Sequence, residues 1–289
     1  MTSTMNRRAA IKTLTLASVG LSLIGPTSAS ETTPSKLPSP ATDKFQLGVA
    51  SVSLKKLPLD RAIAAVRRVG LTNLSINPAH LPWENPPPGW IGAVKIIKDA
   101  GLALRCAGVI YVKNDEAQIR RAFEYVRTLG VPIFTCGPER AALPLVEKFA
   151  KEYDVRVALH NHGPEDKLWP TPQRIWEAIE SLDPHIGLCL DVGHSYRAGS
   201  DPVEAIYQYR ARLYDLHLKD SAAAIGAEDA PVEMGRGRID LSGILTALAK
   251  SGYDQNVWFE YEKDPDDPLP GLAESVGYVR GLMKGLSIA

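Results

Sequence analysis

Short apolar runs alternate with amphipathic segments from Phe45 onward. The apolar runs are continuous, as expected for strands that are buried on both faces of a parallel sheet. The amphipathic segments place apolar side chains at helical spacing, as Ile63, Val66 and Val69 illustrate. The pattern therefore predicts a regular alternation of strands and helices.

Eight strands and eight helices are expected from this alternation. The strands are expected at Phe45–Ser51, Asn73–Ile76, Leu102–Ile110, Val131–Cys136, Val155–His160, Ile186–Asp191, Leu213–Leu218 and Val257–Tyr261. The helices are expected at Leu59–Val69, Trp90–Ala100, Asp115–Leu129, Glu139–Tyr153, Pro172–Ser181, Pro202–Tyr209, Leu241–Lys250 and Leu269–Leu286. Such strand–helix pairs predict an α/β fold with a single (β/α)8 TIM barrel over residues 44–289.

The main alternative fold is an open, doubly wound parallel sheet. Such a sheet would carry a glycine-rich phosphate loop after the first strand. The residues at that position are Gly48, Val49, Ala50 and Ser51, which do not form this motif. The pattern therefore favours the barrel.

The first 29 residues differ from the rest of the chain. Arg7, Arg8 and Lys12 precede a short apolar stretch, Leu14–Ile24, and small residues follow. This order is typical of a secretory signal peptide, and the paired arginines indicate the twin-arginine type. An uncleaved membrane anchor is the alternative, but the apolar stretch is shorter than the roughly 20 residues that a spanning helix needs. We therefore expect residues 1–29 to direct export to the periplasm or the medium by the twin-arginine export machinery, with no stable membrane insertion after processing.

The composition of the rest of the chain limits the kinds of partner and site that the protein can have. Residues 30–43 are rich in Ser, Thr and Pro, which predicts a flexible linker. The chain has 33 basic and 33 acidic residues, and removal of residues 1–29 takes away three basic and no acidic ones, so 30 − 33 leaves a net charge of about −3. This balance excludes the basic surface that a nucleic-acid binder needs. The three cysteines, Cys106, Cys136 and Cys189, lie in or beside apolar runs and are expected to be buried without a redox role.

Polar residues mark the ends of the last four predicted strands, where TIM barrels carry their catalytic residues. They are His160 and His162 at the fifth strand, Asp191 and His194 at the sixth, His217 and Lys219 at the seventh, and Glu260 at the eighth. One histidine at a strand end is more often structural, but four neighbouring strands with such ends indicate a site. Imidazole and carboxylate together favour Zn, Mn, Co or Fe, whereas carboxylates alone would favour Mg or Ca.

Three motifs extend this pattern: D-V-G-H at 191–194, L-H-L-K-D at 216–220 and G-R-G-R-I-D at 235–240. Together with the strand that carries Glu260, they resemble the xylose-isomerase-like barrel superfamily of sugar isomerases and epimerases. The resemblance implies one divalent metal ion (Mn, Zn, Co, Fe or Mg), held at the positions of His160, Asp191, His217 and Glu260. It also implies a substrate contact by His194, and it leaves homodimerisation open.

The fifth strand departs from the family pattern, which is Glu-Asn-His where this chain has His160-Asn161-His162. In the epimerases that the chain resembles, carboxylates on strands five and eight flank the substrate, and one removes a proton that the other returns. A neutral imidazole at position 160 can bind a metal and act as a base, but it lowers the negative charge of the site by one unit. Glu165 is a candidate to restore a carboxylate, and the alternative is a loop-capping or surface residue.

The resemblance implies an enzyme that removes the proton next to a carbonyl of a sugar or cyclitol through an enediolate, with His160, Glu260, His194 and Lys219 as catalytic residues. Return of the proton would make it an isomerase or epimerase, which is the favoured interpretation. Loss of a β-substituent would make it a lyase or dehydratase that acts on keto-glycosides or keto-inositols. Lys219 also has a structural alternative, an ion pair with Asp220 or Glu260.

Two further classes of protein share this kind of barrel. An exported barrel that binds sugars without turnover stays open. Abasic-site endonucleases have the same fold, but they need a basic DNA-binding face that this neutral chain lacks.

Six side chains are candidates for substrate binding: His162, His80, Trp83, Glu84, Glu165 and Arg236. Trp83 and Trp90 flank a Pro-Pro-Pro segment and could stack on a sugar ring, or the segment could be a rigid loop over the barrel mouth. Arg236 could bind an anionic group or be a solvated loop residue.

Overall fold

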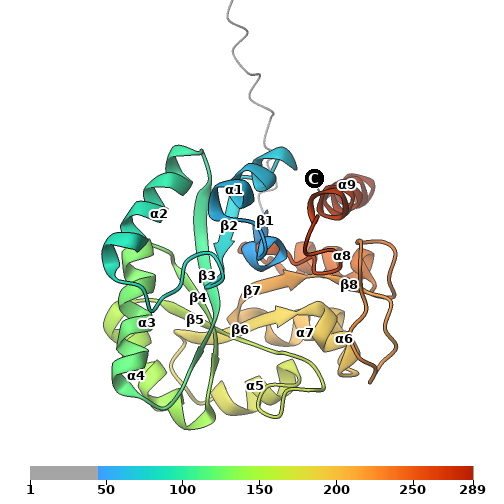
Figure 1. The fold of residues 1–289 in the computed structure, drawn as a ribbon. Helices are drawn as coiled ribbons and strands as arrows, with labels where there is room; N and C mark the ends of the chain where they lie inside the picture. The colour runs from blue at the N-terminus through green and yellow to red at the C-terminus, as the bar shows by residue number, and fades with distance from the viewer. Residues whose placement is uncertain (1–44, 289) are drawn as a thin grey trace, which may run out of the picture. The chain divides into compact units, whose positions relative to one another are not determined.

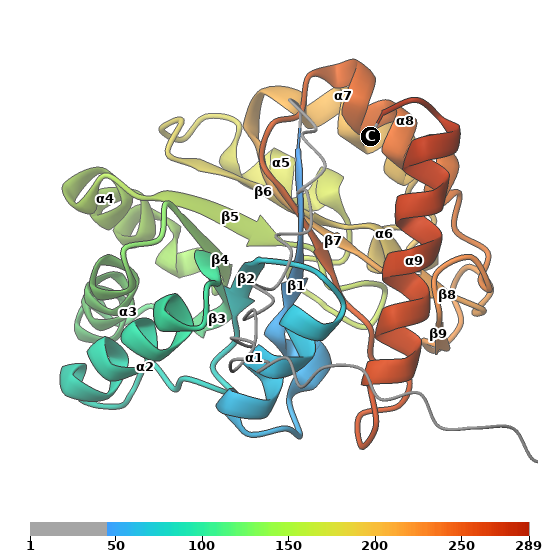
Figure 2. The same ribbon diagram turned by 90° about the horizontal axis from the view of Figure 1, so that it is seen from above.

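The parallel barrel expected from the sequence is present in the protein. The structure, a computed structural model, describes residues 45–288. Eight strands close the barrel in the order β1-β10-β7-β6-β5-β4-β3-β2, and helices surround them (Figure 1 and Figure 2). The barrel strands are β1 (Gln46–Ala50), β2 (Asn73–Ile76), β3 (Ala103–Val112), β4 (Ile133–Pro138), β5 (Arg156–His160), β6 (Ile186–Asp191), β7 (Leu213–Leu218) and β10 (Asn256–Phe259). The prediction of a (β/α)8 barrel is therefore confirmed.

Helices follow the barrel strands in the described part of the chain. They are α1 (Leu59–Arg68), α2 (Pro87–Asp99), α3 (Glu116–Leu129), α4 (Leu143–Tyr153), α5 (Pro172–Ile179), α6 (Val192–Arg197), α7 (Pro202–Tyr209), α8 (Leu241–Ser251) and α9 (Leu269–Gly285). Short 3-10 turns are η1 (Ser51–Leu54), η2 (Arg140–Ala142) and η3 (Arg210–Arg212). Two further strands, β8 (Asp220–Ser221) and β9 (Pro231–Val232), form a small antiparallel ribbon apart from the barrel sheet.

Helix α3 illustrates how the sequence specifies these elements. Asp115 caps its start by accepting a hydrogen bond from the backbone N–H of Gln118 at 3.0 Å. Gly130 ends it with φ 67°, in the left-handed region that glycine favours. Ile119 and Phe123 are fully buried, and α3 packs on β3 and on the neighbouring helices α2 and α4. The burial of this apolar face fixes the helix on the outside of the barrel.

The apolar core has two parts. A large cluster fills the space between strands and helices. A smaller cluster is formed by residues of the barrel strands, which are Ala50, Cys106, Ile133, Ala158, Cys189, Tyr214 and Trp258. All three cysteines are unpaired and buried, as expected from the sequence. Because the interior of such a barrel is packed with side chains, ligands are bound at its rim.

Several elements differ from the predicted ones. Helix α2 begins at Pro87 and not at Trp90, so the proline segment starts a helix. Proline is tolerated there because its missing N–H would have no helical partner in the first turn. Helix α6 was not predicted, since six residues are too few to show a helical period. The β8–β9 ribbon was not predicted either, because each of its strands has two residues.

The segment between β7 and α8 is organised around Asp220. Its carboxylate accepts hydrogen bonds from the backbone N–H groups of Ser221, Gly235 and Gly237 at 2.9 Å and of Ile239 at 3.3 Å. A Cβ atom at Gly237 would lie 2.0 Å from Asp220 Oδ1, so a side chain does not fit there. These contacts explain the G-R-G-R-I-D motif and fix the loop beside the carboxyl end of β7.

Replacing Asp220 by alanine should lower the free energy of unfolding by about 3 kcal/mol, because several backbone N–H groups lose their acceptor. Urea denaturation measures this change. Asp267→Ala is the matched control, since Asp267 is an exposed aspartate, and it should change the free energy by less than about 0.5 kcal/mol. Small, equal effects of both substitutions would show that Asp220 does not hold the loop.

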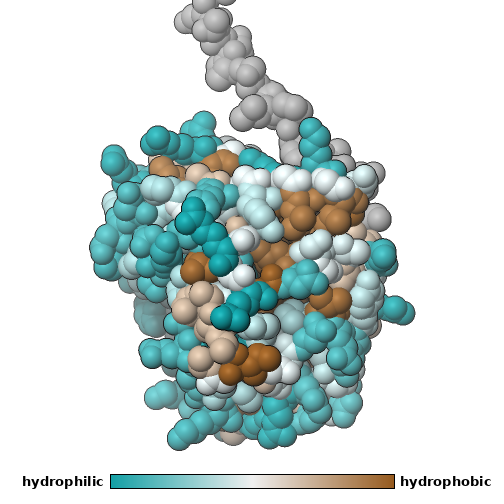
Figure 3. Space-filling model, turned by 90° about the vertical axis from the view of Figure 1, so that its right-hand side faces the viewer, coloured by the Kyte–Doolittle hydropathy of each residue, from teal (hydrophilic) through white to brown (hydrophobic). Residues whose placement is uncertain are grey.

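The outer surface of the described residues carries hydrophobic side chains that do not by themselves indicate a partner. None of the helices within residues 45–288 is long and apolar enough to cross a membrane. Figure 3 shows one face, on which hydrophobic residues form separate patches among hydrophilic ones. The large exposed hydrophobic side chains are Ile91, Ile96, Tyr111, Leu168, Tyr207, Ile225 and Tyr278. The homodimer stays a prediction, and the predicted signal peptide (1–29) and linker (30–43) lie outside the described residues.

Candidate functional site

The carboxyl ends of four barrel strands bring the four predicted metal ligands together. The residues are His160 at the end of β5, Asp191 at the end of β6, His217 in β7 and Glu260 directly after β10. One ligand atom from each lies within 4.8 Å of the others. All four side chains belong to buried residues, with at most 8% exposed. These residues, called the four-residue cluster below, can hold a metal ion.

The polar atoms of the four-residue cluster fit metal coordination. Among the described residues, both ring nitrogens of His160 and of His217, and Asp191 Oδ2, are buried and make no hydrogen bond of good geometry, although charged groups lie close to several of them. Buried polar atoms are nearly always hydrogen-bonded in proteins, so the convergence of such atoms at one place needs a cause. Two imidazoles and two carboxylates form a donor set that suits Zn, Mn, Co or Fe. The side chains present therefore fit the divalent ion expected from the sequence.

One ammonium group, that of Lys219, lies beside both carboxylates of the cluster. Lys219 Nζ lies 2.8 Å from Glu260 Oε1 and 3.1 Å from Asp191 Oδ2. Burial alone would raise the pKa of both carboxyl groups, but Lys219 and the nearby imidazoles outweigh it, and both pKa values lie well below the usual range. Burial would lower the pKa of Lys219, but the carboxylates raise it well above its ordinary value. The ion pair of Lys219 with Glu260, one of the alternatives raised by the sequence, is thus present, and a substrate contact by Lys219 stays a prediction.

The two imidazoles of the four-residue cluster differ in charge. Burial lowers the pKa of His160, so its ring is neutral at neutral pH. Burial acts in the same direction on His217, but Glu260, Asp215 and Asp191 outweigh it and raise its pKa to about 9. Nδ1 of His217 lies 2.6 Å from Glu260 Oε2. In the absence of a metal, His217 therefore carries a proton that a bound cation would have to replace.

Two more histidines border the cluster, so four of the six histidines of the chain meet here. The ring centroid of His162 lies 5.7 Å from that of His160 and 4.7 Å from that of His194. His194 Nε2 lies 3.5 Å from Lys219 Nζ. Burial, followed by Lys219 and the other imidazoles, lowers the pKa of His194 to about 3. His194 is therefore a neutral ring that can hydrogen-bond a ligand but carries no charge.

Arg197, which the sequence analysis did not select, connects the loops around the site. It lies in α6, is 2% exposed, and pairs through both terminal nitrogens with the carboxylate of Glu165 at 2.5 and 2.9 Å. It also donates to the backbone oxygen of Ala227 at 2.8 Å and lies 3.3 Å from His194 Nδ1. The hydrogen bonds from Arg197 lower the pKa of Glu165 to about 2. Glu165 is thus an ionised partner of Arg197, and its suggested role as a replacement for the missing strand-five carboxylate stays a prediction.

Tyr111 is a second residue that the sequence analysis missed. It lies near the end of β3 and is 55% exposed. Its ring meets that of His162 edge-on, with centroids 6.3 Å apart and an angle of 82°. Tyr111 stands in an apolar strand, where an aromatic residue usually belongs to the core, so the pattern of the strand does not distinguish it from a core residue. An exposed ring beside His162 is a candidate surface for the apolar face of a sugar ring.

Two of the predicted substrate-binding residues are engaged elsewhere. The ring of His80 contacts Ser51 Oγ at 3.1 Å and the backbone oxygens of Leu54 and Leu57 at 3.1 and 3.0 Å. Trp83 is 7% exposed and belongs to the large hydrophobic core, as does Trp90. A large apolar ring gains more from burial in the core than from exposure at a rim. These contacts account for His80 and Trp83 as structural residues. Substrate binding by either of them stays a prediction.

The two remaining candidates are exposed. Glu84 lies at the surface before α2. Arg236 pairs with Glu274, its Nε lying 2.6 Å from Oε1. A surface ion pair accounts for this arginine without a ligand, and substrate binding by Glu84 and Arg236 stays a prediction.

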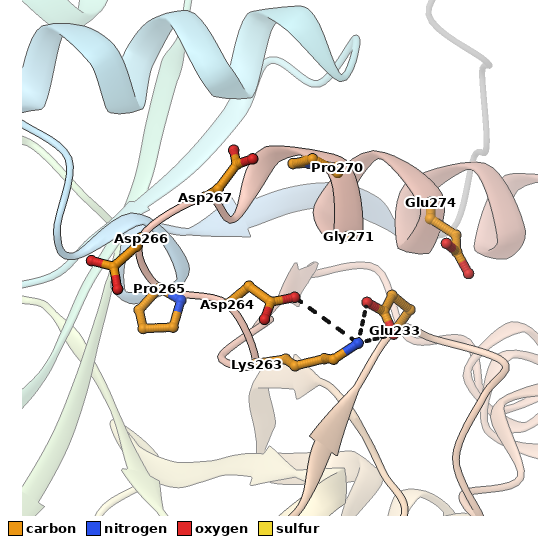
Figure 4. Close-up of a pocket in the computed structure, with 9 residues that line it drawn as sticks. All are labelled: Glu233, Lys263, Asp264, Pro265, Asp266, Asp267, Pro270, Gly271 and Glu274. Atoms are coloured by element: carbon orange, nitrogen blue, oxygen red, sulfur yellow. Dashed lines mark hydrogen bonds and ion pairs between the residues drawn. The ribbon is translucent and has the colours of Figure 1, made fainter.

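A cavity of about 600 Å³ lies between the β10–α9 loop, the start of α9 and Glu233 (Figure 4). Lys263 Nζ lies 2.9 Å from Glu233 Oε1 and 4.0 Å from Asp264 Oδ2. The lining residues are Glu233, Lys263, Asp264, Pro265, Asp266, Asp267, Pro270, Gly271 and Glu274. None of the four-residue cluster lines it, so this acidic cavity is separate from the candidate metal site.

Known proteins resemble the chain over part of its length. Residues 112–282 match the family of xylose isomerase-like TIM barrels. The rhizopine catabolism protein MocC of Rhizobium meliloti is 30% identical over 153 residues, which are 48% of this chain and 46% of that protein. An inosose dehydratase of Clostridium tetani is 29% identical over 153 residues, 46% of this chain and 50% of that protein. The chain thus spans about half the length of the curated relatives it matches.

Solved structures share the fold over most of the chain. A 3-keto-D-glucoside 4-epimerase from E. coli aligns with a TM-score of 0.65 and 16% identity, over 82% of this chain and 100% of that one. An L-ribulose 3-epimerase aligns with a TM-score of 0.67 and 19% identity, over 83% of this chain and 95% of that one. At these identities, the likeness establishes the barrel fold alone.

Proposed function

Because the chain belongs to the xylose isomerase-like TIM barrel family, we propose that it is a metal-dependent enzyme that removes the proton next to a carbonyl of a sugar or cyclitol. The observation that supports this most is the buried cluster of His160, Asp191, His217 and Glu260, whose ligand atoms lie within 4.8 Å of one another. Return of the proton at the other carbon or on the other face would make the enzyme an isomerase or epimerase.

The four-residue cluster would hold one divalent cation, for which Mn, Zn, Co, Fe and Mg are candidates. Bound there, such a cation would polarise the substrate carbonyl and stabilise the negative charge of an enediolate. Lys219 adds a permanent positive charge beside Asp191 and Glu260. Its ammonium group can stabilise negative charge that develops on a substrate oxygen.

Two side chains can move the proton. Glu260 is ionised at neutral pH, because Lys219 and His217 hold its pKa well below the usual range, so it can accept the proton as a base. His160 is neutral, because burial lowers its pKa, and occupies the strand-five position from which relatives act with a carboxylate. We assign it the second proton transfer, in which the ring N–H that does not face the cation would donate to the substrate carbon and water would then restore this hydrogen. His194, a neutral ring with a pKa of about 3, would orient a substrate hydroxyl by a hydrogen bond.

Dehydration is a second candidate function that the curated relatives favour. An inosose dehydratase is similar to about half of this chain, and its name describes loss of water from an inosose. Expulsion of a hydroxyl or a glycosidic oxygen after the same first proton removal would make this protein a lyase. The change from glutamate to His160 affects the group that would return the proton, so it bears on the second step more than on the first.

Incubation in heavy water distinguishes these outcomes. The purified protein is loaded with each candidate cation in turn and mixed with ketoses, 3-keto-glycosides and keto-inositols, and the products are followed by NMR and mass spectrometry. Deuterium at the carbon next to the carbonyl supports an isomerase or epimerase, and loss of water or an aglycone supports a lyase. Ligand binding with full metal loading, but with neither exchange nor cleavage, would refute the proposal and favour a sugar-binding barrel without turnover.

The substitution His160→Glu restores the residue of the resembled family and should keep the metal while changing the chemistry. We expect metal affinity to be kept, because a carboxylate replaces an imidazole, and turnover or the ratio of products to change by about tenfold or more. His160→Ala is the matched comparison and should weaken metal binding. Metal content is measured by elemental analysis. Unchanged metal content and unchanged turnover in both variants would show that His160 is not part of the site.

A further inference from the structure

The barrel interior contains a carboxylate that the proposed reaction does not use. Asp215 lies on β7 two residues before His217 and is fully buried. Alternate residues of a strand share a face, so both side chains point into the barrel. An aspartate that is removed from water in a packed interior is costly unless specific partners hold it. We therefore expect the buried carboxylate of Asp215 to have a structural or functional role.

Three neutral donors from three strands hold the carboxylate of Asp215. Trp258 Nε1, on β10, donates to Oδ1 at 2.5 Å. Thr135 Oγ1, on β4, donates to Oδ2 at 2.6 Å, and Cys106 Sγ, on β3, donates to Oδ2 at 3.4 Å. These contacts fix the orientation of the carboxylate, but none of the three donors carries a positive charge.

The imidazole of His217 is a further neighbour of Asp215. Its Nε2 lies 3.8 Å from Asp215 Oδ2. Its Nδ1, on the other side of the ring, lies 2.6 Å from Glu260 Oε2 and 4.0 Å from Asp191 Oδ2. One ring nitrogen thus faces the buried carboxylate, and the other faces the candidate metal ligands.

We propose that Asp215 is a positioning residue that keeps the hydrogen of the His217 imidazole on Nε2 and leaves the lone pair of Nδ1 free for the metal. Histidines that bind metals commonly direct their other ring N–H to a carboxylate, which fixes the tautomer and the ring orientation. The buried site of Asp215 and its three fixed hydrogen bonds prepare the carboxylate for this contact. The inference rests on the metal centre of the proposed function, and it holds for either the isomerase or the lyase outcome.

The substitution Asp215→Asn should move the hydrogen of the His217 ring from Nε2 to Nδ1, and it changes the shape of the side chain little. The amide oxygen can still accept from Trp258 Nε1, and the amide nitrogen then replaces Oδ2. Thr135 can turn its hydroxyl to accept from this nitrogen, since a hydroxyl is both donor and acceptor. The amide N–H facing His217 Nε2 favours a lone pair there, which moves the ring hydrogen to Nδ1. The substitution should therefore oppose metal binding at Nδ1.

Zinc titration of the full chain against a chelator tests this. Asp215→Asn should weaken Zn²⁺ binding by about 10–100-fold, with the circular dichroism spectrum of the metal-free protein retained. Asp183→Asn is the matched control, because Asp183 also faces a histidine, His185, with Oδ1 2.7 Å from Nδ1, but does so before β6 at the opposite end of the barrel. The control should bind Zn²⁺ as the wild type does.

A second measurement does not depend on the folding of a variant. ¹⁵N NMR of the Zn²⁺-loaded wild type, with labelled histidines, reports which nitrogen of His217 carries hydrogen, and we expect Nε2. Hydrogen on Nδ1, or equal zinc affinities of Asp215→Asn and wild type, would overturn the inference alone. Absence of zinc binding by the wild type would instead refute the metal centre of the proposed function, and the inference with it.

Discussion

Replacing Asp191 by asparagine is expected to weaken binding of divalent cations by more than about 100-fold, because loss of an outer partner of a metal ligand alone commonly costs 10–100-fold. Asp191 Oδ2 is buried among the ligand atoms, makes no hydrogen bond of good geometry within the described residues, and lies 3.1 Å from Lys219 Nζ. The other oxygen, Oδ1, caps α6 by accepting from the backbone N–H of His194 at 2.8 Å. Asparagine can keep this cap, so the substitution removes the charge and leaves the helix.

Asp201→Asn is the matched control for this result. Asp201 caps α7 in the same way, accepting from the backbone N–H of Val203 at 2.8 Å, and it is exposed. Calorimetric titration with Mn²⁺ or Zn²⁺ should give wild-type affinity for this variant. Equal affinities of the Asp191 and Asp201 variants would mean that Asp191 does not bind the cation.

The apparent metal affinity should rise about 100-fold between about pH 6 and pH 8, because one proton must leave the site when the cation binds. That proton belongs to His217, whose pKa in the metal-free protein is about 9. The pKa values of Asp191 and Glu260 lie well below the usual range, so these groups release no proton, and burial lowers the pKa of His160, so His217 dominates the release. Affinity therefore gains up to about tenfold per pH unit until about pH 9.

The same group affects the stability of the metal-free protein in the opposite direction. The pKa of His217 is raised from 6.5 to about 9 on folding, so its stabilising contribution is complete below about pH 6.5 and is lost as the pH rises to about 9. In His217→Gln, the pH dependence of metal affinity should become flatter and the affinity lower. A wild-type affinity that does not change between about pH 6 and pH 8 would contradict the assignment of His217.

The strand ends could be predicted because the repeat is simple. Alternating apolar runs and amphipathic helices specify a barrel, and a parallel barrel places all strand ends on one face. His160, Asp191 and His217 therefore come together in the structure as the sequence predicts. The sequence named Glu260 as one possible partner of Lys219, but the second partner, Asp191, follows from the register of the strands, which the sequence does not state.

The contacts that depend on distant segments could not be predicted in this way. Arg197 meets Glu165 through a short helix that has no recognisable period. Asp215 shares a face with His217, which the alternation of the strand would have shown. Its donors Thr135 and Trp258, however, come from other strands and are identified only when the barrel is closed.

The environment of aromatic residues could not be predicted from the sequence either. Trp83, which could stack on a sugar or belong to a rigid loop by its sequence, is 7% exposed in the hydrophobic core, whereas Tyr111 stands in an apolar strand and is 55% exposed. Composition and spacing do not distinguish these two environments, because either ring suits a core or a rim. The side on which each ring lies depends on how the chain packs around it.

The central claim is that His160, Asp191, His217 and Glu260 hold one divalent cation. A crystal structure of the protein grown with Zn²⁺, with an anomalous difference map recorded at the zinc edge, tests it most directly. We predict one strong peak bounded by these four residues, at about 2.0–2.2 Å from a nitrogen or oxygen of each. A fully occupied peak in the acidic cavity lined by Glu233 and Asp264 in its place, or a map without any peak at the four-residue cluster, would contradict the claim.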